Sequence, residues 1–280
     1  MATCLVALGS NLGDREAIVC TAMTELSNVG RVARRSRLCR TRPVGGTPGQ
    51  DEFINAAAVV ETSLEPLPLL RSLQAIENRH ARQRDVRWAA RTLDLDLLLY
   101  DERTVDSAEL VVPHPRMSFR RFVLEPAVEV ADRMLHPTIG WTIDRLLEHL
   151  NTAADRVAIL APVEQVRRRL AAELAVRCGL HPIVPPEDTS LRRWPSGWTT
   201  WLTLEGLANR PPPTAPKLTI ILDADAAQPA ESADWRELSS PWDRGPTLVL
   251  RAADRARIDA EATAAVQAVW PLLCLPGPSA

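Results

Sequence analysis

Two aspartates separated by a single leucine, Asp94 and Asp96, lie in a run that is rich in leucine. Alternate side chains of a β-strand point to the same face, so a strand here would place both carboxylates on one face and the leucines on the other. Two carboxylates on an apolar strand are unfavourable unless a positive group neutralises them. Oxygen ligands at this spacing suit Mg²⁺, which takes one or two carboxylates together with phosphate oxygens and water.

A cluster of four arginines precedes this pair, comprising Arg82, Arg84, Arg87 and Arg91. Guanidinium groups bind phosphate through paired hydrogen bonds and stay charged. Together with a carboxylate-bound metal they suit phosphoryl transfer, in which catalysis is mainly positioning and charge neutralisation. The alternative is a surface strand whose aspartates pair with nearby arginines, and the spacing alone does not separate the two.

The overall charge narrows the classes of partner. A length of 280 residues favours one or two domains, and a net charge of −2 gives no long-range attraction for nucleic acid or an anionic membrane. The single lysine of the chain is Lys217, in Ala-Pro-Lys-Leu. A phosphate-binding loop of the G-x-x-x-x-G-K-[ST] kind needs a lysine at its seventh position, so the sequence excludes that loop.

The cysteines and the N-terminus predict a cytoplasmic protein. Five scattered cysteines form no C-x-x-C pair, which disfavours a zinc site and suits reduced thiols. The first residues lack the basic region and the long apolar core of a signal peptide. No apolar run reaches the roughly eighteen residues that a membrane helix needs.

Hydrophobic periodicity predicts an α+β fold for the first part of the chain. The expected elements are a strand over 3–9, a helix from Asp14 to about 29, strands over 31–40 and 53–61, a helix over 66–82 and a strand over 92–100. This β-α-β-β-α-β order is typical of a ferredoxin-like antiparallel sheet with both helices on one face. Further helices are expected near 120–131 and 141–150.

The composition changes near residue 160, which predicts a domain over 1–160 and a C-terminal region over 161–280. Six of the eight tryptophans and two proline clusters lie after this point. The expected elements there are a helix over 163–178, strands over 218–222 and 247–250, and a helix over 254–270. A strand followed by a helix, twice over, predicts a smaller α/β region.

Six segments of the first part resemble one enzyme family. Arg91-Thr-Leu-Asp94-Leu-Asp96-Leu-Leu is similar to the signature R-x-x-D-[LIV]-D-[LIVM]-[LIVM] of 6-hydroxymethyl-7,8-dihydropterin pyrophosphokinases. The other similar segments are Leu8-Gly-Ser-Asn-Leu12, Arg40-Thr41-x-Pro43-Val-Gly45, Phe53-Ile-Asn55-Ala-Ala, Val112-Pro113-His114-Pro-Arg-Met117 and Arg120-Arg-Phe122-Val-Leu-x-Pro126. The resemblance implies transfer of pyrophosphate from ATP to 6-hydroxymethyl-7,8-dihydropterin, with release of AMP, in folate biosynthesis.

The resemblance also implies residue roles. Asp94 and Asp96 would hold two Mg²⁺ ions on ATP and, with Arg82 and Arg91, form the catalytic set. The pterin would lie between Phe53 and Phe122, where stacking contributes about 1–3 kcal/mol per ring. The implied pterin-binding residues are Thr41, Pro43, Val44, Phe53, Asn55, Trp88 and Phe122. The implied ATP-binding residues are Gln74, Glu77, Arg84, Arg87, Trp88, Arg91, Leu97, His114 and Arg120.

Several of these residues have a plainer interpretation. Phe53 and Phe122 could be core residues, and Trp88 could serve packing alone. His114 could only cap a turn, and Arg84 and Arg87 could be solvated surface charges. The chain also departs from the family at one loop, because Trp88-Ala-Ala-Arg91 stands where W-G-P-R is usual.

The C-terminal region is not explained by this family. Its segments over 216–224 and 245–251 are faintly similar to deoxynucleoside kinases, yet the phosphate-binding loop is missing. We therefore expect a non-catalytic remnant that acts as a scaffold or binds a partner, and the alternative is an appendage without chemistry. The rival reading of the whole chain is a binding protein with an inactive first part, which the presence of both aspartates and the arginines disfavours.

Overall fold

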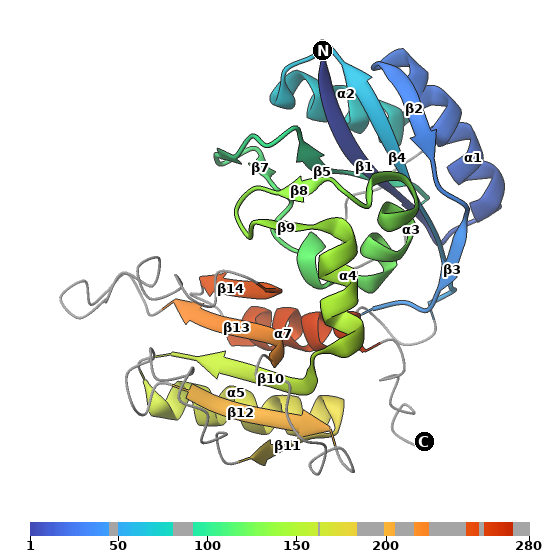
Figure 1. The fold of residues 1–280 in the computed structure, drawn as a ribbon. Helices are drawn as coiled ribbons and strands as arrows, with labels where there is room; N and C mark the ends of the chain where they lie inside the picture. The colour runs from blue at the N-terminus through green and yellow to red at the C-terminus, as the bar shows by residue number, and fades with distance from the viewer. Residues whose placement is uncertain are drawn as a thin grey trace. The chain divides into compact units, whose positions relative to one another are not determined.

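A computed structural model describes residues 1–44, 50–80, 92–161, 163–183, 199–204, 216–223, 245–251 and 255–270. The chain divides into two compact units, Met1–Leu147 and Glu148–Ala280 (Figure 1). Strand β10 (Ala154–Leu160) belongs to the sheet of the second unit, so that unit begins before the boundary expected near residue 160. The assignment of separate roles to 1–160 and 161–280 stays a prediction.

The first unit is built on an antiparallel sheet, as predicted. Its strands are β1 (Ala2–Ser10), β2 (Arg31–Arg35), β3 (Cys39–Thr41), β4 (Phe53–Thr62) and β5 (Asp94–Tyr100). They follow the order β2-β4-β1-β5, and β3 also pairs with β4. The centre of the sheet is therefore β1 with β4, and β5 forms one edge.

Helices cover both faces of this sheet (Figure 1). Helices α1 (Arg15–Glu25) and α2 (Pro66–Arg79) pack on one face, which we call the first face. Helix α3 (Arg121–Ala131) packs against β4, β1 and β3 on the other face. The core on the first face is formed by alternate strand residues and by both helices, comprising Cys4, Val6, Leu8, Val19, Met23, Leu26, Ala56, Ala58, Val60, Leu69, Leu73, Ile76, Leu95 and Leu97. This alternation leaves the intervening strand residues to line the second face.

The strand expected over 31–40 is interrupted in the structure. Ser36 keeps hydrogen bonds to β4, because its N–H donates to the Ala57 carbonyl and its Oγ accepts from the Ala57 N–H, at 2.9 and 2.8 Å. The next N–H, of Arg37, donates instead to Glu129 Oε2 at 2.9 Å. Arg37 thus leaves the ladder, and pairing with β4 resumes at Cys39 as β3.

The other elements expected within 1–160 are present with shifted ends. A 3₁₀ turn over Leu26–Asn28 follows α1, α2 is described to Arg79, and β5 begins at Asp94. The helices expected near 120–131 and 141–150 correspond to α3 and α4 (Ile143–Thr152). The small elements, which the sequence did not predict, are β6 (Val105–Asp106), β7 (Val111–Val112), a 3₁₀ turn (Met117–Phe119), β8 (Leu135–His136) and β9 (Trp141–Thr142).

The second unit contains a five-stranded mixed sheet. Its elements are β10, α5 (Glu164–Cys178), β11 (Leu180–Ile183), β12 (Thr199–Leu204), β13 (Pro216–Asp223), β14 (Thr247–Arg251) and α7 (Arg255–Val269). The order is β11-β12-β10-β13-β14, in which β10, β13 and β14 are parallel and the other pairs are antiparallel. Both helices pack on the sheet and on each other.

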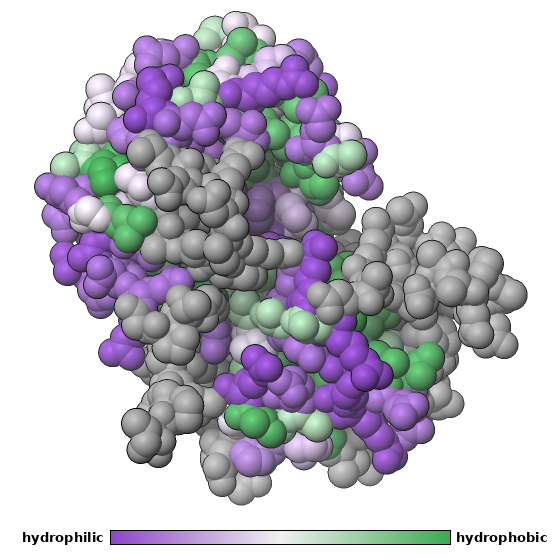
Figure 2. Space-filling model, turned by 180° about the vertical axis from the view of Figure 1, so that it is seen from behind, coloured by the Kyte–Doolittle hydropathy of each residue, from purple (hydrophilic) through white to green (hydrophobic). Residues whose placement is uncertain are grey.

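On the face that Figure 2 shows, the described residues are mostly hydrophilic, with hydrophobic residues scattered between them. Single exposed apolar side chains of this kind are ordinary in soluble domains. No helix in the described ranges is both long and apolar enough to cross a membrane.

Candidate functional site

Asp94 and Asp96 lie on the face of β5 that points away from α1 and α2. Both are half-buried, and the leucines that alternate with them, Leu93, Leu95 and Leu97, are buried in the core of the first face. This is the arrangement that the two-residue period of a strand predicts. The carboxylates therefore occupy the second face, at the edge of the sheet.

The register of the sheet places the two carboxylates beside residues that were predicted to bind the pterin. Gly9 of β1 lies opposite Asn55 of β4 on one side and opposite Asp94 of β5 on the other. Directly opposed residues of an antiparallel pair share a face. Asn55, Gly9 and Asp94 consequently form one row across the sheet, with the smallest residue at its centre.

Gly9 is a site residue that the sequence analysis did not single out. A Cβ atom at this position would lie 3.2 Å from Asn55 Oδ1, so the absence of a side chain leaves room for the Asn55 amide. In the next row Ala7 lies opposite both Ala57 and Asp96. The only sequence feature that could have indicated this role is the Gly-Ser-Asn motif, which is equally typical of a turn after a strand.

The Asn55 side chain is only 6% exposed and its orientation is defined. Its Nδ2 donates a hydrogen bond to Thr41 Oγ1 at 2.7 Å, which links β4 to β3. Thr41 lies opposite Phe53 in the same pair of strands. Thr41, Pro43, Val44 and Phe53 are all half-buried, so each retains surface that a ligand can contact.

His114 faces the carboxylates from the segment that follows β7. Its Nε2 lies 4.0 Å from Asp96 Oδ2, and its backbone N–H donates to the Leu98 carbonyl at 2.9 Å. Its Nδ1 accepts a hydrogen bond from the Arg116 N–H at 3.2 Å, so His114 caps a turn and also faces Asp96. Burial, reinforced by the charges of Arg120 and Arg116, lowers the pKa of His114 to about 3. The ring is therefore neutral at neutral pH, and Nε2 carries its proton.

Arg120 and Phe122 lie at the start of α3. The guanidinium carbon of Arg120 is 5.5 Å from the centre of the Phe122 ring, a distance typical of a cation–π contact. Helix α3 packs against β4, the strand that carries Phe53. Both phenylalanines are half-buried rather than fully enclosed, so each keeps surface for a ligand.

Two of the predicted ATP-binding side chains lie in the interior. Glu77, on α2, is 0% exposed, and its Oε1 accepts a hydrogen bond from the Leu95 N–H at 2.8 Å. Leu97 is buried in the core of the first face. Gln74, one turn before Glu77 on α2, is half-buried. Glu77 follows Leu73 by four positions and lies on the same stripe of α2, which is buried in the structure.

The remaining predicted residues lie outside the described part of the chain. They are Arg82, Arg84, Arg87, Trp88 and Arg91. Among the described residues no group of three or more His, Cys, Asp or Glu side chains could hold a metal ion. Two carboxylates alone suit Mg²⁺ in one setting, in which phosphate oxygens and water complete the coordination. The donor set of Asp94 and Asp96 thus fits Mg²⁺ that arrives with a polyphosphate.

Comparison with known proteins identifies relatives of the first unit. The family model for 7,8-dihydro-6-hydroxymethylpterin-pyrophosphokinase (HPPK) matches residues 5–132. A 2-amino-4-hydroxy-6-hydroxymethyldihydropteridine pyrophosphokinase of Bacillus subtilis (strain 168) is 43% identical over 131 residues, which cover 46% of this chain and 78% of the relative. The Haemophilus influenzae protein of the same name is 40% identical over 140 residues, covering 49% of this chain and 86% of the relative.

A solved structure of an HPPK-DHPS in complex with substrates is also similar to this chain. It is 13% identical, with a TM-score of 0.42, and the likeness covers 52% of this chain and 43% of that chain. This chain therefore spans less than half the length of the HPPK-DHPS chain. The family match ends at residue 132, and the predicted likeness of the C-terminal region to deoxynucleoside kinases stays a prediction.

Proposed function

Because this chain belongs to the 7,8-dihydro-6-hydroxymethylpterin-pyrophosphokinase family, we propose that its first unit transfers pyrophosphate from ATP to 6-hydroxymethyl-7,8-dihydropterin. The products are AMP and the pterin diphosphate, and the reaction belongs to folate biosynthesis. The observation that carries the proposal is the row Asn55–Gly9–Asp94, which puts an amide beside a carboxylate on one face of the sheet. The order of strands and helices supports a ferredoxin-like description of this unit.

Asp94 and Asp96 are the residues that we assign to Mg²⁺. Their spacing on one face and their partial exposure suit two ions shared with the phosphates of ATP. Bound Mg²⁺ supplies neutralisation of the phosphate charge. Asp96 also faces the neutral ring of His114, whose Nε2 lies 4.0 Å from Asp96 Oδ2 and would donate its proton to a phosphate oxygen.

The pterin side of the site is assigned to β3, β4 and the start of α3. Phe53 and Phe122 would stack on the two faces of the ring, and the Asn55 amide would pair with its polar edge. The hydrogen bond from Asn55 Nδ2 to Thr41 leaves Oδ1 directed over Gly9 as the acceptor for a ring N–H. The remaining assigned residues are Thr41, Pro43, Val44 and Trp88.

The ATP side of the site is assigned to cationic and polar residues around the carboxylates. Guanidinium groups would bind the phosphate oxygens, and the half-buried Gln74 would contact the nucleotide. Leu97, whose side chain is in the core, can contribute only through its backbone. The assigned residues are Gln74, Arg82, Arg84, Arg87, Trp88, Arg91, Leu97, His114 and Arg120.

The proposed reaction is a displacement at the β-phosphorus of ATP. The hydroxymethyl oxygen of the pterin forms a bond to the β-phosphorus of ATP, and the bond from that phosphorus to the oxygen of the α-phosphate breaks. AMP leaves with that oxygen, and the hydroxyl proton passes to solvent. The protein residues align the two substrates and hold charge near the transferring group, which supplies most of the catalysis in reactions of this type.

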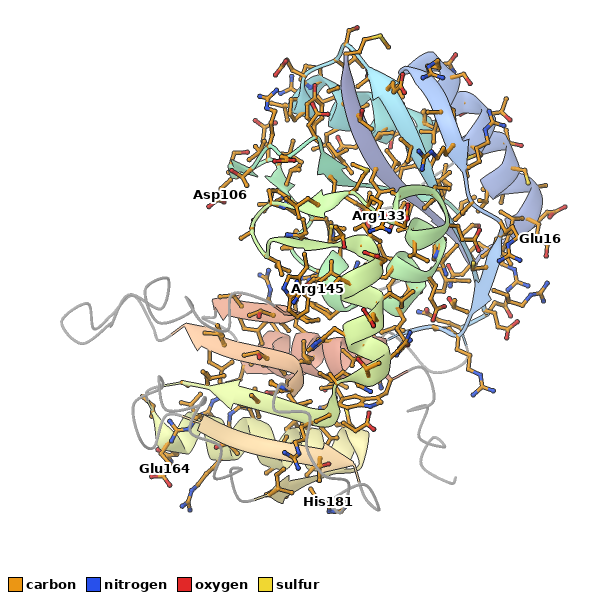
Figure 3. All side chains as sticks on the ribbon, viewed as in Figure 1. Glu16, Asp106, Arg133, Arg145, Glu164 and His181 are labelled. Carbon is orange, nitrogen blue, oxygen red and sulfur yellow. The ribbon has the colours of Figure 1, made fainter. Side chains whose placement is uncertain are left out.

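Release of AMP from ATP, dependent on the pterin and measured with saturating Mg²⁺, tests the proposal. We expect Asp96→Ala to lower turnover by about a thousandfold, the upper range for loss of one electrostatic group, while pterin affinity changes little. Asp106→Ala is the matched control, because Asp106 is an exposed carboxylate on β6 that points away from the sheet (Figure 3). Absence of AMP from the unmodified chain would refute the activity, and normal AMP release by Asp96→Ala would refute the metal assignment.

A further inference from the structure

Glu77 is a buried acidic residue with a specific backbone partner. It lies in the last turn of α2 and is 0% exposed. Its Oε1 accepts a hydrogen bond from the backbone N–H of Leu95 at 2.8 Å. Leu95 is the residue between Asp94 and Asp96. The Glu77 carboxylate therefore binds the backbone between the two aspartates from the opposite face of the sheet.

The bond closes the outer edge of β5. In an antiparallel pair, successive residues direct their N–H groups alternately toward the partner strand and away from it. Asp94 and Asp96 lie opposite Gly9 and Ala7 of β1, and the Leu95 N–H is directed to α2 instead. A buried backbone N–H needs an acceptor, and a carboxylate is a strong one. Glu77 therefore supplies the pairing that a further strand would give at this edge.

Both ends of Leu95 are fixed by this arrangement. Its side chain is buried in the core of the first face, and its amide is held by Glu77. Any displacement of Leu95 would move the two neighbouring carboxylates with it. The distance and orientation of Asp94 relative to Asp96 thus depend on a residue on the opposite side of the strand.

We propose that Glu77 is a positioning residue, which holds Asp94 and Asp96 in place for Mg²⁺ through the Leu95 amide. The inference rests on the proposed function of this site. A side chain without exposed surface on the same helix stripe as Leu73 acts through Leu95 rather than by direct contact with ATP. Groups that orient metal ligands commonly change metal affinity by roughly 10- to 100-fold when they are removed.

Two substitutions separate the acceptor from the charge. Glu77→Ala removes the acceptor, and Glu77→Gln retains an oxygen that can accept from the Leu95 N–H. Asn78→Ala is the matched control, because Asn78 is exposed on the same turn of α2. Each full-length variant is compared by amide hydrogen exchange at Leu95 without ligands. Mn²⁺ binding is measured by calorimetry in the presence of a non-hydrolysable ATP analogue, which requires no turnover.

For Glu77→Ala we expect faster exchange at Leu95 together with Mn²⁺ affinity weaker by at least about tenfold. Glu77→Gln should stay within about threefold of the unmodified chain in both measurements, because a neutral acceptor replaces a charged one. Unchanged Mn²⁺ affinity in Glu77→Ala would overturn the inference even if exchange at Leu95 increased. The inference would also be overturned if the Glu77→Gln variant were folded but bound Mn²⁺ as weakly as the Glu77→Ala variant. Neither measurement depends on AMP release, so loss of the proposed activity is a separate result.

Discussion

Gly9 separates the two halves of the candidate site. It lies between Asn55 and Asp94 in the sheet, and any side chain there would rise into the space above the row. A Cβ would be 3.2 Å from Asn55 Oδ1, closer than ordinary van der Waals contact. Gly9→Ala should therefore displace the Asn55 amide and weaken pterin binding by about tenfold, which corresponds to about 1.4 kcal/mol. Calorimetric titration with the pterin measures this change.

A double-mutant cycle shows whether Gly9→Ala acts through Asn55. If it does, the substitution should add little once Asn55→Ala has removed the amide, and the two effects should be non-additive. Mn²⁺ binding with the ATP analogue should change less than pterin binding, because the added methyl group meets the Asn55 side. Fully additive losses of pterin affinity would show that Gly9 acts by another route.

At this scale the strand residues were predictable and the buried acid was not. The period of a strand already placed Asp94 and Asp96 on one face, because side-chain direction follows from backbone geometry alone. The hydrogen bond from Leu95 to Glu77 depends on how α2 meets the edge of β5, which no local pattern contains. His114 illustrates the same limit, because one ring both caps a turn and faces Asp96.

Helix α1 begins directly after Asp14, the residue from which a helix was expected. The side chain of Asp14 accepts a hydrogen bond from the Ala17 N–H at 3.1 Å, as an N-cap carboxylate does. Asp14→Ala should lower the free energy of unfolding by about 1 kcal/mol, and Asp14→Asn, which keeps a capping oxygen, should lower it much less. Urea unfolding followed by far-ultraviolet circular dichroism measures both. Equal losses for the two variants would mean that the cap bond does not stabilise the helix.

The hairpin of β8 and β9 contains a buried histidine that should make stability depend on pH. Burial lowers the pKa of His136 from 6.5 to about 4, while its Nδ1 accepts from the Ile139 N–H at 3.3 Å. Between pH 6.5 and 4 the unfolded chain binds more protons at this residue than the folded one, so stability falls as the pH falls through this window. One such group contributes at most about 1.4 kcal/mol per pH unit.

His136→Asn removes this titration and keeps a side-chain acceptor. The free energy of unfolding of the variant should fall less steeply than that of the unmodified chain between pH 6.5 and 4, and the two slopes should agree above pH 7. The comparison cancels other groups that titrate in the same window, including His114. Urea unfolding at half-unit intervals of pH gives both slopes, and identical slopes below pH 6.5 would contradict the burial effect.

Elements with a clear period were predicted, and those set by tertiary contacts were not. The long β1 and β4 and the amphipathic α2 carry their own pattern. The break between β2 and β3 depends on Glu129 of α3, ninety-two positions from its partner Arg37. Strand β10 contains a continuous apolar run, Val157–Leu160, and follows α4 almost directly. No glycine or proline in the sequence marks where the helix ends and the strand begins. Strand β11 has only four residues and includes a proline.

The molecule consists of two units, and only the first has a proposed catalytic function. Every residue of the family match, 5–132, lies within the first unit. The second unit has its own sheet and its own buried polar cluster, which we call the Lys217 cluster and which comprises Asp155, Lys217 and Trp270. The expectation that this region is a non-catalytic scaffold or binds a partner stays a prediction.

The Lys217 cluster joins β10, β13 and the end of α7. Lys217 is 5% exposed, and its Nζ pairs with Asp155 Oδ1. The Trp270 Nε1–H donates to the same oxygen at 2.7 Å, and Lys217 Nζ lies 5.4 Å from the centre of the Trp270 ring. Removal of one partner from a buried ion pair leaves the other charge without compensation, which typically costs about 3–5 kcal/mol.

Lys217→Met should therefore destabilise the second unit and leave the first unit active. We expect a fall of about 3 kcal/mol in its free energy of unfolding and a smaller fall for the matched pair Asp155→Asn/Lys217→Met, which removes both charges. Tryptophan fluorescence during urea unfolding reports mainly on this unit, because six of the eight tryptophans lie after residue 160. AMP release below the unfolding transition should stay within about twofold of the unmodified chain, because the assigned site residues all belong to Met1–Leu147. Loss of AMP release that follows the unfolding of the second unit would show that the first unit needs the second unit to be folded. An unchanged unfolding midpoint in Lys217→Met would show that the Lys217 cluster does not stabilise the second sheet.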